Sequence, residues 1–144
     1  MFSSSTAQLL NQLAALHRHS LPAYLRFTRP WVGYEDEEAV DVLRQLASDH
    51  KYLVDKIVAQ LEPLGLDLPL GQFPMEFTSL HDLSVEYLVK RTQQFQQGFV
   101  ERLDDLAAVM PNEPPARELA EEALGMAKGH LKNLEEAAAD LAAS

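Results

Sequence analysis

The chain has no cysteine, no long hydrophobic run and few basic residues. The absence of cysteine excludes disulfides, thiolate metal ligands and cysteine nucleophiles. No apolar stretch approaches the roughly 18 residues that would span a bilayer. The first residues also lack the basic and apolar regions of a secretory signal. We therefore expect a cytoplasmic protein that does not associate with membranes.

Positive charge is scarce, because 12 lysines and arginines stand against 22 aspartates and glutamates, giving a net charge of −10. Binding to nucleic-acid phosphates needs clustered positive charge, so we expect no nucleic-acid partner. Hydrophobic residues make up 47% of the 144 positions, which is enough to build a core. This length and composition predict one domain over residues 1–144.

Four segments have the three-to-four-residue apolar spacing of amphipathic helices, and none alternates like a strand. The first is expected over residues 5–28, with a kink at Pro22 because proline leaves the Arg18 carbonyl without its donor. The others are expected over residues 36–64, 79–110 and 116–141. Gly65 is a suitable C-cap for the second helix, and the proline-rich link 111–115 separates the last two.

The links between these helices predict the topology. The short links 29–35 and 111–115 indicate that the helices they join are antiparallel neighbours. The link of residues 65–78 reaches roughly 46 Å when extended, and the second helix has an expected length of about 43 Å. The predicted fold class is therefore an all-α four-helix bundle with one long crossover between helices 2 and 3.

Three histidines, His17, His50 and His130, fall on the apolar stripes of three different predicted helices. A buried polar group without a partner costs roughly 1–3 kcal/mol, so each imidazole needs one. Two explanations are open. The three histidines hold a single metal ion, iron or zinc, with Gln94 or a water completing the site. Alternatively, they are core histidines bonded to the backbone, to one another or to trapped water.

Short motifs surround these histidines. They are Leu10-Asn11-x5-His17-x6-Tyr24, Ala47-x-x-His50, Ala127-Lys128-Gly129-His130 and the link Pro69-Leu70-Gly71-x5-Phe77-Thr78-Ser79. In this order, residues 10–141 resemble the ferritin superfamily, most closely the bacterioferritins and the starvation-type mini-ferritins. The resemblance implies a ferritin-like bundle of iron-handling ancestry, and we expect a homodimer or a higher homo-oligomer.

The chain departs from that family where the family binds iron. A di-iron site needs about four carboxylates and two histidines. Here both Glu-x-x-His motifs carry alanine, Ala47 and Ala127, and His17 stands at the position of the first-helix glutamate. Glu86 resembles the third-helix ligand but is expected about 12 Å from the level of His130. The resemblance therefore implies a degenerate di-iron site.

Two further family sites are also replaced. The haem-binding methionine of bacterioferritins falls at Ser48, and Pro30-Trp31 stands in place of the mini-ferritin His-Trp pair, so we expect no haem. Counting from the last link places Gln94 level with His130. The third-helix residues expected to face that level are Thr92, Phe95 and Phe99. Phenyl rings there would fill the space that metals occupy in the family.

The sequence thus leaves two main functions open. The first is a metal-binding ferritin-like protein with an altered single-ion site at His17, His50 and His130. The second is a non-catalytic helical binding or scaffold protein without metal. A ferroxidase and iron-storage protein ranks third because it needs more carboxylates, and we assign no catalytic residue. Of the remaining candidates, Tyr24 is expected in the core, and His19 and His81 at the surface.

Overall fold

The structure, a computed structural model, describes residues 3–28, 37–64 and 85–143, and every regular element in these ranges is helical. The elements are α1 (Ser4–Arg18), α2 (Leu21–Thr28), α3 (Glu37–Leu61), the short 3-10 turn η2 (Glu62–Leu64), α4 (Val85–Val109) and α5 (Ala116–Ala143). The predicted all-helical class is confirmed for this part of the chain. None of the described helices has the length and apolar character needed to cross a membrane.

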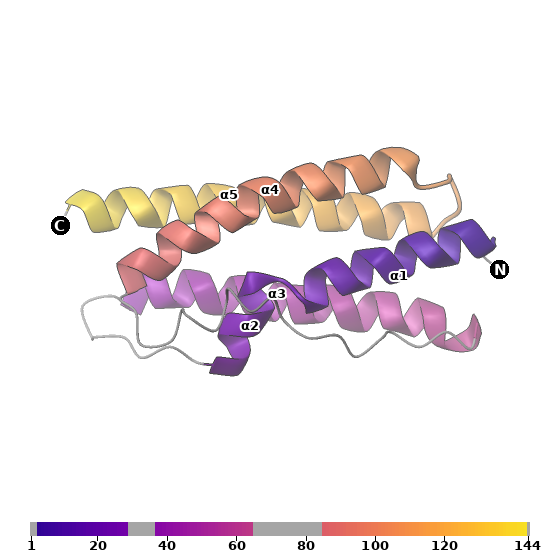
Figure 1. Cartoon of the computed structure of the whole chain (residues 1–144), viewed down its shortest axis with the longest axis horizontal. Coiled ribbons are helices and arrows are strands. Elements are labelled where there is room, and N and C mark those ends of the chain that lie inside the picture. Colours follow the sequence, from indigo (N-terminus) through magenta and orange to yellow (C-terminus); the bar gives the residue numbers. More distant parts are fainter. Residues whose placement is uncertain (1–2, 29–36, 65–84, 144) are drawn as a thin grey trace.

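Four long helices lie side by side, and α2 turns away from them after α1 (Figure 1). Helices α1 and α5 run in one direction, and α3 and α4 run in the other. As a result, α3 ends at the opposite end of the molecule from the start of α4, as the expected long crossover requires. The crossover itself, the predicted helix start near Ser79 and the C-cap Gly65 lie outside the described residues.

The prediction of one kinked helix over residues 5–28 is wrong, because the chain forms two helices separated by His19 and Ser20. Pro22 has no N–H to continue the α1 ladder, but it is tolerated within the first turn of α2, where that N–H has no helical partner. Ser20 starts α2 as its N-cap, since its Oγ accepts the backbone N–H of Ala23 at 3.3 Å.

The predicted apolar stripes of α3 and α5 are buried. On α5, all the predicted positions from Ala116 to Ala137 are buried, and only Leu141 near the end is half-buried. On α3, Leu43, His50 and Ile57 are buried as expected, whereas Val54 on the same stripe is half-buried. The four-three spacing of these positions follows the 3.6-residue turn, which explains why the stripe and the buried face coincide.

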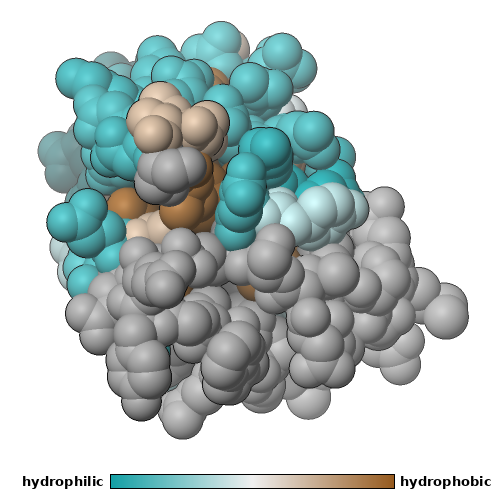
Figure 2. All heavy atoms as spheres, turned by 90° about the vertical axis from the view of Figure 1, so that its left-hand side faces the viewer, coloured by the Kyte–Doolittle hydropathy of each residue, from teal (hydrophilic) through white to brown (hydrophobic). Residues whose placement is uncertain are grey.

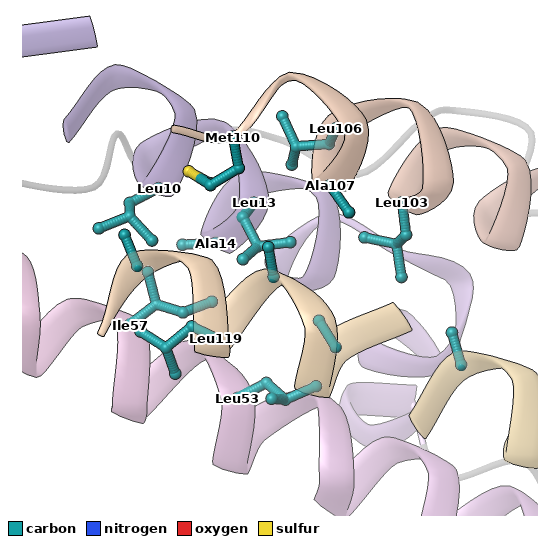
Figure 3. Packing of buried hydrophobic residues seen from close by; sticks show 14 of the residues in the cluster. Leu10, Leu13, Ala14, Leu53, Ile57, Leu103, Leu106, Ala107, Met110 and Leu119 are labelled. Atoms are coloured by element: carbon teal, nitrogen blue, oxygen red, sulfur yellow. The ribbon is translucent and has the colours of Figure 1, made fainter. Parts of the chain in front are cut away.

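The core consists of two hydrophobic clusters. The first cluster packs one half of α1, α3 and α5 against the C-terminal half of α4, and Figure 3 shows Leu10 and Leu13 of α1 among Leu53, Leu106 and other members of this cluster. The second cluster joins α2 to the other halves of α3, α4 and α5. Hydrophilic side chains cover much of the described surface at the α5 C-terminal end of the molecule (Figure 2).

Candidate functional site

A layer of buried polar residues separates the two hydrophobic clusters. Along the chain, the layer residues fall between members of the first cluster and members of the second. On α3, for example, His50 lies between Leu53 of the first cluster and Leu46 of the second. The members of this central layer are His17, Ser20, His50, Thr92, Gln96 and His130. These six are most of the buried polar residues in the described part of the chain.

The structure brings the three predicted histidines into this one layer. The ring centroids of His17 and His50 are 4.9 Å apart, and those of His50 and His130 are 6.1 Å apart. His17 and His50 are each 1% exposed, and His130 is 8% exposed. The stripes on α1, α3 and α5 therefore meet at the level that the sequence predicted.

One hydrogen bond fixes the tautomer of His17. Its Nδ1 lies 2.8 Å from the backbone oxygen of Leu13, one turn earlier on α1. A carbonyl oxygen only accepts, so Nδ1 must carry the proton. In the neutral ring, the lone pair is then on Nε2.

The break between α1 and α2 fixes the tautomer of His50. Ser20 Oγ donates to the backbone oxygen of His17 at 2.7 Å and lies 2.9 Å from His50 Nδ1. A hydroxyl has one proton, and the carbonyl takes it, so His50 Nδ1 must donate to Ser20 Oγ. His50 therefore also carries its neutral-state lone pair on Nε2, and it is hydrogen-bonded to the helix cap of α2.

Burial keeps these two rings neutral. It lowers the pKa of His17 from 6.5 to about 4, against the opposing effect of the Leu13 hydrogen bond. Burial also lowers the pKa of His50 well below 6.5, and the neighbouring His17 and His130 lower it further. At neutral pH, both imidazoles are therefore uncharged.

The third histidine has a carboxylate partner that the sequence did not predict. His130 Nε2 lies 2.7 Å from Asp49 Oδ2, and the other carboxylate oxygen of Asp49 accepts from Gln45 Nε2 at 2.9 Å. The carboxylate requires a proton on Nε2 of His130. Within the described residues, His130 Nδ1 is buried without a hydrogen-bond partner. Asp49 sits at the edge of the α3 stripe, so periodicity alone does not single it out.

Phe99 occupies the space beside two of the histidines. Its ring stacks on His50 at a centroid distance of 5.1 Å and meets His17 edge-on at 5.0 Å. Phe95 is half-buried and stacks on Phe99 at 5.5 Å. The expectation that phenyl rings fill this level is therefore confirmed for Phe99.

The residues proposed to complete a metal site lie elsewhere. Gln94 is exposed and accepts from Arg91, and Glu86 is exposed and pairs with Lys90. The buried glutamine is Gln96, which donates to the backbone oxygen of Ala127 at 3.2 Å. Of the two candidates for completing the site, Gln94 or a water, Gln94 is placed outside the layer, because helix rotation as well as level decides which residue faces inward.

The remaining candidates have mixed outcomes. Tyr24 is buried in the second cluster as expected, whereas His19 is half-buried rather than at the surface. Two polar oxygens in the layer, Thr92 Oγ1 and Gln96 Oε1, are buried without hydrogen-bond partners among the described residues. His81 and Trp31 lie outside the described part of the chain.

Among the described residues, the buried polar side chains of the layer include no carboxylate. Bridging two iron ions requires carboxylates inside the bundle, whereas Ala47 and Ala127 are buried and Glu86 is exposed. Over residues 3–28, 37–64 and 85–143, no three His, Asp or Glu side chains are already placed as metal ligands. The chemistry that the layer does offer is three imidazoles, each with one hydrogen-bonded nitrogen.

Replacing Ser20 by alanine tests the bond between the helix break and the layer. The substitution removes the α2 cap, worth about 1 kcal/mol, and leaves His50 Nδ1 with the long 3.5 Å contact to the backbone oxygen of His17, so that most of the roughly 1–3 kcal/mol cost of a poorly paired buried donor applies. We expect Ser20→Ala to lower the free energy of unfolding by about 2–3 kcal/mol in urea denaturation. Ser20→Thr should retain most of the free energy of unfolding, because threonine keeps the hydroxyl. Ser48→Ala, at an exposed position of α3, should change the free energy of unfolding little. A Ser20→Ala loss below about 1 kcal/mol would contradict this role.

Comparison of the chain with protein-family models, with curated proteins and with solved structures finds no match in any of the three. The resemblance to the ferritin superfamily therefore remains a prediction from the residues.

Proposed function

We propose that the protein is a ferritin-like four-helix bundle, with one long crossover, that has lost di-iron chemistry and binds a single transition-metal ion at its central layer. The support for the fold is the parallel direction of α3 and α4 between two antiparallel pairs. The support for the site is the set of three histidines from three helices. A metal ion bound there would link α1, α3 and α5.

The observation that carries this proposal is the hydrogen-bonding state of the three rings. Each imidazole donates one N–H to a fixed acceptor: Leu13 O, Ser20 Oγ and Asp49 Oδ2, respectively. Histidines that bind metals characteristically donate their other ring nitrogen in this way, which fixes the tautomer and the ring orientation. Neutral imidazole nitrogens suit zinc, iron, copper or nickel.

The buried acceptor atoms of the layer favour the binding of a cation. Among the described residues, His130 Nδ1 and Gln96 Oε1 are buried without hydrogen-bond partners. The amide oxygen is an acceptor, and so is Nδ1 of a neutral His130 that donates through Nε2, so a cation or a hydrogen-bond donor would satisfy both. Asp49 supplies negative charge one hydrogen bond away, which offsets part of the cost of burying a cation.

A second function, a non-catalytic bundle without metal, is favoured by Phe99. Its ring lies against both His17 and His50, so metal binding requires this phenyl ring to move. In the metal-free alternative, His50 and His130 link helices through their hydrogen bonds to Ser20 and Asp49, whereas His17 bonds to Leu13 within α1 and packs against His50 and Phe99. The two functions differ in what added metal does to the protein.

Titration with Co²⁺ and Zn²⁺ separates them. We expect Co²⁺ to develop the visible absorption of nitrogen coordination, and Zn²⁺ at about 100 times its dissociation constant to add about 2.7 kcal/mol to the free energy of unfolding. His50→Gln should abolish both effects because it removes a ligand. His19→Gln, which removes an imidazole outside the layer, should retain them.

The opposite result would favour the metal-free bundle. Protein that is purified without chelator, contains no metal and unfolds identically with and without Zn²⁺ would overturn the proposed site, since a ligand of the native state alone must raise stability. Equal Co²⁺ spectra for the wild type and His50→Gln would place binding elsewhere. Circular dichroism of His50→Gln checks that it keeps its helices.

A further inference from the structure

The central layer comes closest to solvent at one point, His130. The other five layer residues are each at most 1% exposed, whereas His130 is 8% exposed. The side chain of its partner Asp49 is 23% exposed. A small ion that enters the layer along the shortest route from solvent therefore meets this pair first.

A pocket of about 290 Å³ lies at this point, between α3 and α5. Its lining residues are Asp41, Val42, Gln45, Leu46, His130 and Asn133. Two of them, Gln45 and His130, are the residues that hydrogen-bond the two carboxylate oxygens of Asp49. The pocket thus reaches the ring of a layer histidine, and its wall residues Gln45 and His130 are hydrogen-bonded to the Asp49 carboxylate behind them.

The charge of the pocket suits a cation. Asp41 lines it, and among the described residues its carboxylate makes a long 3.8 Å ion pair with Arg44 between two exposed side chains. Asp49 lies behind the wall, and the whole chain carries a net charge of −10. Carboxylates in and behind the wall of a concave surface raise the local concentration of cations and their association rate.

We propose that metal cations reach the central layer through this pocket, with Asp49 as the carboxylate that attracts them and the ring of His130 as the wall that they pass. This access route rests on the proposed metal-binding function. It adds a path from solvent to the layer and gives Asp49 and His130 a role in the entry of the ion. The ring has one nitrogen on Asp49 and the other buried.

Filling the pocket tests the route. Asn133 lies on an exposed turn of α5 and lines the pocket, so Asn133→Trp should narrow it without disturbing the core. A blocked route slows entry and exit equally, whereas a lost ligand speeds exit. We expect stopped-flow absorbance to show Co²⁺ association and dissociation both slowed roughly tenfold or more, with the dissociation constant unchanged. Lys132→Trp, an exposed neighbour outside the pocket, is the matched control and should keep wild-type rates.

Removing the carboxylate charge gives an independent test. Asp49→Asn should slow Co²⁺ association and flatten its dependence on salt, because steering by charge is screened by ions. Asp55→Asn is the control, since Asp55 is an exposed α3 carboxylate that pairs with Lys51. Co²⁺ binding by the wild type with unchanged rates in Asn133→Trp and Asp49→Asn would overturn the route alone. Absence of Co²⁺ binding by the wild type would overturn the proposed function and the route with it.

Discussion

Acidification from pH 7 to about 4.5 is expected to remove several kcal/mol of the free energy of unfolding, because it protonates the unfolded chain more readily than the folded layer. The pKa of His17 falls from 6.5 in the unfolded chain to about 4 in the folded protein. At roughly 1.4 kcal/mol per pKa unit, this single residue is worth about 3 kcal/mol. His50 shifts in the same direction from the same cause, burial.

The sign of this effect follows from the depressed folded-state pKa values. Above pH 6.5 the two histidines are neutral in both states, and their contribution to stability is complete. As the pH falls from 6.5 towards 4, the unfolded chain takes up protons that the buried rings do not, so stability decreases. Where two protons separate the states, the slope reaches roughly 2.7 kcal/mol per pH unit.

Urea denaturation at a series of pH values, followed by circular dichroism, measures this slope. The range above about pH 4.5 isolates histidines from most carboxylates. Glu113, whose pKa is lowered chiefly by its hydrogen bond from Thr6, acts only below that range. His17→Gln should reduce the slope by about half, whereas His19→Gln should change it much less because His19 is half-buried. A free energy of unfolding that stays constant from pH 7 to 4.5 would contradict the neutral, buried state of the layer.

Periodicity predicted the helices and the histidine layer because both depend on which face of a helix is apolar. The stripe through His50 on α3 and the stripe through His130 on α5 are buried as expected. The three rings meet because of the directions of the helices and the lengths of the links, and both can be inferred from the sequence. Predicting them requires no information about individual side-chain contacts.

The partners of the histidines were harder to predict because each depends on local geometry. Ser20 reaches His50 only because the chain breaks before Pro22, and a kinked continuous helix would not form this cap. The sequence Ser20-Leu21-Pro22 does contain the signal, since serine precedes a proline in the first helical turn. The choice of Gln96 over Gln94 follows from the α4 stripe, because Thr92, Gln96, Phe99 and Leu103 are spaced by four, three and four residues.

Truncation of Phe99 is expected to cause the largest loss of stability of any single substitution proposed for α4. The side chain is 1% exposed and stacks on Phe95 and His50. Phe→Ala changes at such positions cost about 3–5 kcal/mol, because the transfer energy of the ring and the energy of the cavity both count. Phe99→Leu fills more of the space, so we expect it to cost about half as much. The exposed Val109→Ala on the same helix should stay within about 0.5 kcal/mol of the wild type.

The same substitution distinguishes the two functions of the layer. If the phenyl ring must move before a metal binds, Phe99→Ala removes that obstacle, and its affinity for Zn²⁺ should exceed that of the wild type. Zn²⁺ would then restore part of the lost stability, since binding to the native state alone adds RT ln(1 + [L]/Kd). Guanidinium denaturation of Phe99→Ala with and without Zn²⁺ measures both quantities. A variant that loses about 3–5 kcal/mol and gains nothing from Zn²⁺ would identify the layer as a structural polar network, in which Phe99 packs against the rings of His17 and His50.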